Sequence, residues 1–191
     1  MPEEFAWINP PPRWSGNAAA LDFETGPRTD FWRETFYGFT RESGHAWVAP
    51  VVGDFSVSVR FRGAYATLYD QAGLMVLGEG GAWMKTGIEF TDGLMHFSVV
   101  VSATRSDWSV IPLPEATPDT EIAARISRDG DAVRVHYAVA GGDWRLARLA
   151  PFVAGPARAG LMACSPERAG FTARFEALEI GPPIPRALHA D

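Results

Sequence analysis

Cysteine and lysine are almost missing from this chain of 191 residues, which contains one of each, Cys164 and Lys85. A single cysteine cannot form an internal disulfide, which suits a reducing compartment. Cys164 itself is expected to be a buried, small apolar residue. The bias toward arginine usually reflects genome composition, so the retention of one lysine is the more informative observation.

Long apolar runs and clusters of basic residues are also missing. No segment approaches the roughly 18 consecutive apolar residues of a membrane span, and the acidic N-terminus lacks the pattern of a secretory signal. The 17 basic and 23 acidic residues give a net charge of -6, which disfavours nucleic acid as a partner. We therefore expect a cytoplasmic protein that binds neither membranes nor nucleic acid.

Patterns for metals and nucleotides are absent as well. The histidines have no zinc-ligand spacing, and Asp70, Asp92 and Asp107 are too scattered for a lectin-type calcium site. The GEGG segment at 78–81 lacks the Lys-Ser/Thr pair of a phosphate-binding loop, so we interpret it as a turn between strands. The sequence predicts no metal and no cofactor.

Alternation of apolar and polar residues is the dominant pattern. DFSVSVRF at 54–61 places phenylalanine and valine on one face, which is typical of a half-buried strand. Segment 122–149 predicts three strands with turns at Asp-Gly and Gly-Gly, and segment 160–180 predicts two strands around Ser-Pro-Glu-Arg. Only short segments such as 30–36 could be helical, and their aromatic residues suit a strand equally well.

One domain over residues 1–191 fits both length and composition. Hydrophobic residues make up 47% and charged residues 21% of the chain, as in globular proteins. Short strands with turns between them predict an all-β fold, an antiparallel two-sheet sandwich. The proline-rich ends at 9–14 and 181–191 are expected to be extended or frayed, so the core spans about 5–180 and a tail follows.

The segment with most candidate functional side chains is a predicted hairpin, WMKTGIEF at 83–90 followed by LMHFSVVV at 94–101. A two-residue turn at Asp92-Gly93 fixes the register of the two strands. The predicted cross-strand pairs are Glu89 with His96, Gly87 with Ser98, and Lys85 with Val100. Side chains paired in this way lie within reach of one another.

The same register separates two faces. The core face contains Met84, Ile88, Phe90, Phe97 and Val99. The other face contains Trp83, Lys85, Glu89, His96 and Ser98. An exposed Trp83 is costly unless a ligand stacks on it, and Gly87 beside it would let that ligand approach the backbone. The alternative is a solvated sheet surface on which Glu89 and His96 form a pair worth at most ~1 kcal/mol.

Two flanking segments extend this candidate site. Tyr69, Gln71, Gly73 and Met75 share one face of the preceding strand, and SDWS at 106–109 follows the next strand. The alternative for SDWS is a local turn whose tryptophan plugs the core edge. The candidate ligand-binding residues are Tyr69, Gln71, Trp83, Lys85, Glu89, His96, Ser98, Asp107 and Trp108.

These segments also resemble a known family. YDQAGL at 69–74, W-x-K-x-G-x-E at 83–89 and SDWS at 106–109 are together similar to the YesU-like family of uncharacterised domains, which includes fungal "regulation of enolase" proteins. That family is similar to the concanavalin A-like lectin/glucanase superfamily. The resemblance implies a curved jelly roll with a concave ligand-binding sheet, and copies that often form a homodimer. It implies no particular reaction.

Carbohydrate binding is the first functional hypothesis. Sugars stack their C–H faces on tryptophan and tyrosine, and their hydroxyls need donors and acceptors such as Gln71, Lys85 and Glu89. The expected partner is therefore a carbohydrate or another small polar ligand.

Two further functions stay open. A sugar-active enzyme would use Glu89 with His96 or Lys85 as an acid–base pair, or with Asp70 or Asp107 as a second carboxylate. No paired-carboxylate motif is present on the strand of Glu89, which argues against a glycosidase. The third hypothesis is a protein-interaction or regulatory module that docks a partner on the aromatic face.

Overall fold

The computed structural model describes residues 4–188. Residues 1–3 of the predicted domain and 189–191 of the predicted tail lie outside that range. Between them the chain is built from strands, and a 3-10 turn, η1 (Glu79–Gly81), occupies the GEGG segment where a turn was expected. In this part of the chain, no helix has the length and apolar character needed to cross a membrane.

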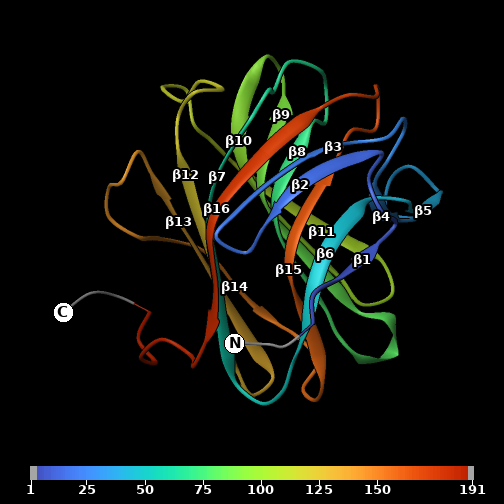
Figure 1. Ribbon diagram of the computed structural model, residues 1–191. Coiled ribbons are helices and arrows are strands. Elements are labelled where there is room, and N and C mark those ends of the chain that lie inside the picture. Colours follow the sequence, from blue (N-terminus) through green and yellow to red (C-terminus); the bar gives the residue numbers. More distant parts are fainter. Residues whose placement is uncertain (1–3, 189–191) are drawn as a thin grey trace.

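Two antiparallel sheets of seven strands face each other (Figure 1). Sheet A contains, in spatial order, β1 (Ala6–Ile8), β6 (His45–Val51), β15 (Ala157–Cys164), β8 (Gln71–Leu77), β9 (Trp83–Thr91), β10 (Leu94–Ser102) and β11 (Ser106–Pro112). Sheet B contains β14 (Arg145–Pro151), β13 (Ala132–Val139), β12 (Ile122–Asp129), β7 (Phe55–Gly63), β16 (Thr172–Gly181), β3 (Ala20–Glu24) and β2 (Arg13–Asn17). The predicted all-β sandwich is confirmed.

A small hairpin, β4 (Phe31–Arg33) and β5 (Thr40–Glu42), stands apart from both sheets. It lies on the side of sheet A that faces away from sheet B (Figure 1). The segment at 30–36, for which a helix was the alternative, therefore contains a strand. We call this hairpin, with its connecting loop, the roof.

The proline-rich N-terminal segment departs from the prediction. Strand β2 begins at Arg13, directly after Pro12, and pairs with β3 over its whole length. Proline blocks a ladder only where its own nitrogen is needed, so pairing starts as soon as the prolines end. Beyond Gly181 the described part of the C-terminal tail contains no strand, as expected.

The predicted turn and register of the central hairpin are confirmed. β9 and β10 pair Glu89 with His96 and Lys85 with Val100. Asp92 and Gly93 have φ angles of 54° and 74°, the positive values that a two-residue hairpin turn requires. The register therefore sends alternate side chains to opposite faces of sheet A.

One of these faces forms the main core between the sheets. Met84, Ile88, Phe97 and Val99 are buried there, and Phe90 packs against them, as predicted. The opposite face carries a second apolar cluster, which the roof covers. Its members are Phe31, Trp32, Ala46, Val48, Met75, Trp83, Val100, Met162 and Cys164. Burial of Cys164 confirms its expected apolar role, and burial raises the pKa of its thiol to about 12.

Candidate functional site

A cavity of about 220 Å³ lies between the roof and the outer face of sheet A. The roof and the residue before it contribute Asp30, Trp32, Tyr37, Phe39 and Arg41. Sheet A and the loop before β8 contribute Tyr69, Gln71, Lys85, Glu89, Val100 and Trp108. The loop after β15 adds Pro166 and Glu167. Aromatic rings and ionisable groups therefore share one enclosed space.

Five of the nine residues predicted for the site line this cavity. They are Tyr69, Gln71, Lys85, Glu89 and Trp108. Ser98 is placed behind the cavity lining, where its hydroxyl donates a hydrogen bond to Glu89 Oε2 at 2.9 Å. Trp108 in turn donates from Nε1 to the Ser98 hydroxyl at 3.1 Å. Ser98 therefore connects the carboxylate to the tryptophan without lining this cavity itself.

The predicted exposure of Trp83 is wrong. Its side chain is 2% exposed because the roof covers it. The Arg33 guanidinium and the Lys85 ammonium lie 5.9 and 6.0 Å from the centroid of its ring, within reach of a cation–π attraction. Strand parity gives the face that a side chain takes, but it does not show whether a distant segment covers that face. Trp83 supports Lys85 and is not a stacking platform.

Gly87 also has a different role from the one expected. It faces Gly73 across β8 and β9. A Cβ atom on either glycine would lie 2.0 Å from a carbonyl oxygen of the facing strand, and their φ angles are 150° and 159°. The close backbone approach within sheet A thus accounts for both glycines, without a ligand.

His96 and Asp107 lie outside the cavity. His96 is paired with Glu89 in the backbone register, but its Nδ1 contacts the Leu94 carbonyl oxygen at 3.3 Å. Asp107 binds Arg148 at 2.6 Å on the exposed edge of sheet A. The SDWS segment is the start of strand β11 and not a local turn. The predicted acid–base pairing of Glu89 with His96 is therefore not formed by their side chains.

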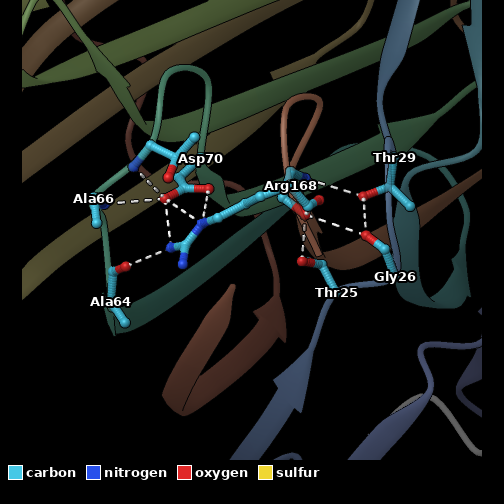
Figure 2. Close-up of polar contacts among 9 residues, drawn as sticks. Thr25, Gly26, Thr29, Ala64, Ala66, Asp70 and Arg168 are labelled. Atoms are coloured by element: carbon cyan, nitrogen blue, oxygen red, sulfur yellow. Dashed lines mark hydrogen bonds and ion pairs between the residues drawn. The ribbon is translucent and has the colours of Figure 1, made fainter. Parts of the chain in front are cut away.

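Asp70, the other carboxylate considered, is fully buried and fully engaged. Figure 2 shows Arg168 reaching Asp70, with Nη2 2.6 Å from Oδ2 and Nε 3.0 Å from Oδ1. The backbone N–H groups of Ala66 and Thr67 also donate to Oδ2, at 3.0 and 2.9 Å. A carboxylate that accepts this many donors has no oxygen left for a ligand. The structure rules out Asp70 and Asp107 as cavity carboxylates.

The Asp70–Arg168 ion pair instead fixes two walls of the cavity relative to each other. Asp70 lies between Tyr69 and Gln71, and Arg168 follows Glu167, and all three of these neighbours line the cavity. Because Asp70 is 0% exposed, this ion pair is screened less than a surface pair. This gives the conspicuous aspartate of the YDQAGL segment a positioning role.

Lys85 is held at the base of the cavity by two partners. Its ammonium donates to Asp30 Oδ1 at 2.9 Å and to Gln71 Oε1 at 2.7 Å, and the residue is 3% exposed. Burial acts to lower the pKa of Lys85, but the negative charges of Asp30 and Glu89 outweigh it and raise the pKa. Lys85 is therefore a charged donor at neutral pH and not a nucleophilic amine.

Glu89 is the chemically distinctive group of the site. It is 5% exposed, and burial raises the pKa of its carboxyl although Lys85 and the Ser98 hydrogen bond oppose the shift. Oε2 accepts from Ser98, whereas Oε1 has no hydrogen-bond partner among residues 4–188. Oε1 is not among the solvent-inaccessible polar atoms that lack a partner, so it keeps access to the cavity and can accept a hydrogen bond from a ligand. Glu89 can therefore accept a hydrogen bond from a ligand or exchange a proton with it.

Aromatic rings form the apolar walls. Trp32 meets Trp108 edge to face at a centroid distance of 6.5 Å and meets Tyr37 at 5.7 Å. The hydroxyl groups of Tyr37 and Tyr69 share a hydrogen bond of 2.8 Å between the roof and the start of β8, which raises the pKa of Tyr69. These rings leave flat apolar surfaces on several sides of the polar base.

Sequence reasoning missed the contribution of the roof. Asp30, Trp32, Tyr37, Phe39 and Arg41 line the cavity, but the segment was considered only for its secondary structure. Five aromatic residues within 31–39 were the available signal. So dense an aromatic run outside the alternating strands indicates a segment whose rings pack over another part of the protein.

Fold and site together define an antiparallel, jelly-roll-type β-sandwich domain with a ligand-sized cavity beneath a β-hairpin. The chain belongs to the family described as "Protein of unknown function (DUF1349)", which matches residues 7–183. It is 39% identical over 184 residues to "Regulation of enolase protein 1" of Saccharomyces cerevisiae, covering 96% of this chain and 92% of that protein. The resemblance drawn from the sequence is confirmed.

Solved structures with the same fold include one relative of similar sequence and two of distant sequence. A functionally unknown protein from Saccharomyces cerevisiae superposes with a TM-score of 0.88 at 38% identity, over 94% of this chain and 97% of that one. "Xyloglucan PUL GH43B" of Bacteroides ovatus gives 0.66 at 14% identity, over 92% of this chain but 36% of that one. An alginate lyase from Klebsiella pneumoniae gives 0.56 at 12% identity, over 90% and 84%. The last two show the shared fold alone.

Proposed function

We propose that this protein binds a sugar or sugar-derived polar ligand in the cavity beneath the roof. The observation that carries the proposal is the nearly buried carboxylate of Glu89, whose Oε1 stays accessible from a cavity that also contains Lys85 and Gln71. A sugar hydroxyl donates to a carboxylate and accepts from an ammonium, so one ligand can engage both groups.

The aromatic walls support the same ligand class. Trp32, Tyr37 and Trp108 present ring faces and edges to the cavity. Sugar rings have apolar C–H faces that pack on such surfaces, while their hydroxyls reach the polar base. The names of fold neighbours, which include a xylan beta-1,4-xylosidase and an alginate lyase, are in keeping with a carbohydrate ligand.

The test is a binding screen on the purified protein with monosaccharides, uronic acids and short oligosaccharides, read by calorimetry or ligand-observed NMR. Glu89→Gln and Trp108→Ala are each expected to weaken binding at least about tenfold, the loss of one good polar or stacking contact. Phe36→Ala is the matched control, because Phe36 is 94% exposed in the roof loop and does not line the cavity. Absence of binding across the panel, or wild-type affinity in Glu89→Gln, would contradict the proposal.

Acid–base catalysis on the bound sugar is the second candidate, favoured by the raised pKa of Glu89. A general acid must keep its proton near neutral pH, and burial moves Glu89 in that direction. The other cavity carboxylates are Asp30, which is paired with Lys85, and the exposed Glu167. Product release from any sugar found to bind, lost in Glu89→Gln, would establish this activity. Binding without turnover would leave the protein a binding module.

A further inference from the structure

The attachment of the roof to sheet A limits which part of a carbohydrate can enter. We infer that the cavity takes a free monosaccharide or the terminal unit of a chain, and excludes the interior of a polysaccharide. The inference rests on the proposed function and adds the class of ligand that the site selects.

The roof is fastened at one end of the sheet by Arg33. Its guanidinium donates to the carbonyl oxygen of Gly81 at 2.7 Å and to that of Ala103 at 3.2 Å. Its backbone N–H donates to the Ser106 hydroxyl at 2.9 Å. These acceptors lie beside the start of β9, the end of β10 and the start of β11. A chain lying along these strands would have to pass through the Arg33 contacts.

The segment that leads into the roof is fastened on the opposite side. Ser165, after β15, donates from its N–H to Thr29 Oγ1 at 3.0 Å and from its hydroxyl to the Gly26 carbonyl oxygen at 3.2 Å. Figure 2 shows this set of contacts beside the Asp70–Arg168 ion pair. The roof is thus anchored on two sides of sheet A.

A third attachment lies at the base of the cavity. The Lys85–Asp30 ion pair, at 2.9 Å, joins the sheet to the residue before β4, and both side chains are nearly buried. A buried ion pair resists separation because each partner would be left as an uncompensated charge. The roof and sheet A are therefore joined at this pair, and a chain cannot pass between them there.

The volume points to the same class of ligand. Sites for drug-sized molecules occupy about 300–1,000 Å³, and this cavity of about 220 Å³ lies below that range. It accommodates one ring with its substituents. Tyr37 and Trp108 are 45% and 39% exposed, so they lie at the mouth of the cavity. The rest of a longer chain would leave the cavity past these two residues.

The experiment compares binding with chain length and with blocked ends. Xylo-, manno- and gluco-oligosaccharides and oligo-alginates, from dimer to hexamer, are titrated beside their monosaccharides, and each hexamer is also tested with both terminal units chemically capped. For the series that binds, we expect a dissociation constant per molecule that stays within about twofold from dimer to hexamer, because each chain offers one end. The monosaccharide should compete, and the capped hexamer should lose binding at least about tenfold.

Two results overturn the inference. An affinity that rises in proportion to length, or a capped hexamer that binds as the free one, would show that internal units enter, while the proposed sugar binding would stand. If no member of any series binds, both the inference and the proposed function fail. Arg33→Ala supplies a further check, because removing this attachment should let the capped hexamer regain measurable binding.

Discussion

One ion pair on the outer face of each sheet shows how different the surroundings of similar charges are in this molecule. On sheet B, Arg174 pairs with Asp22 at 3.9 Å, and both side chains are more than half exposed. On sheet A, Lys85 pairs with Asp30 at 2.9 Å, with side chains only 4% and 11% exposed. Lys85 and Arg174 both alternate with core residues along their strands. The outer face of sheet A differs because it also carries an apolar cluster, and the roof that covers this cluster encloses the polar groups beside it.

This difference matters because burial changes what a charge costs. Exposed ion pairs contribute little to the free energy of unfolding, whereas buried charges must be paired or they destabilise the fold. The buried pairs of the two sheets, Lys85 with Asp30 and Arg134 with Asp129, each compensate their charge within the pair. Glu89 is also nearly buried but forms no ion pair of this kind among residues 4–188, which supports a role in ligand binding.

The largest expected loss of stability comes from removing the buried lysine of sheet A, and it can be compared with the same change at an exposed arginine of sheet B. Lys85→Ala leaves Asp30 and Glu89 buried without their cation, so we expect it to lower the free energy of unfolding by about 3–5 kcal/mol. Arg174→Ala, the matched change on sheet B, should cost less than about 1 kcal/mol. Urea denaturation of both variants measures the contrast. Equal losses would mean that the roof does not shield the ion pair.

How much of the fold and of the site the sequence predicts depends on how far apart along the chain the contacting residues lie. The register of β9 and β10 followed from a local turn at Asp92-Gly93, and the structure confirms it. Local signals also gave β7, β12, β13, β14 and β16 of sheet B, but not β2 and β3. These features need only alternation and turn chemistry, which short segments of sequence contain.

The error at Trp83 and the omission of Tyr37 have a common physical cause. Both depend on the roof folding over sheet A, through contacts such as Tyr37–Tyr69, 32 positions apart, and Lys85–Asp30, 55 positions apart, which no periodicity reports. The engaged carboxylate of Asp70 is similar, since its partner Arg168 lies 98 residues away. Local pattern thus gave the side chains of the cavity base, and long-range packing decided which of them form a site.

A covered histidine on sheet B extends the comparison to pH. His136 is 8% exposed, and burial together with the charges of Arg125 and Arg134 lowers its pKa to about 4. The folded state therefore favours the neutral ring, whereas the unfolded chain binds a proton near pH 6.5. The contribution to stability is complete above pH 6.5 and is lost as the pH falls toward 4.

We expect this loss to be about 1–2 kcal/mol, reduced from the full linkage value because solvent screens part of the interaction. His136→Gln should flatten the decline of stability between pH 6.5 and 4, measured by urea denaturation at several pH values. His45, whose pKa burial also lowers, should leave a residual slope. An unchanged slope in His136→Gln would show that its ring is not held neutral by its surroundings.

The smallest expected change in stability, that of Glu89→Gln, bears most directly on function. Burial raises the pKa of Glu89, so the folded state favours its protonated form, and the stability that it contributes is present below about pH 4.5 and lost as the pH rises through the raised pKa. Glutamine keeps the acceptor for Ser98 and carries no charge. Glu89→Gln should therefore match or exceed wild-type stability at pH 7, by up to about 1 kcal/mol.

Thermal unfolding at pH 5 and pH 7 measures this change, with Glu176→Gln on sheet B as the control, since Glu176 makes surface contacts with Arg62 and Arg174. Removing this partly exposed acid, whose side chain is 30% exposed, should change stability little at either pH. If Glu89→Gln stabilises the fold and also weakens ligand binding, the role of Glu89 is to bind the ligand. A loss of more than about 2 kcal/mol in Glu89→Gln would instead make Glu89 a structural group, and the roofed face would then differ from the open one in packing alone.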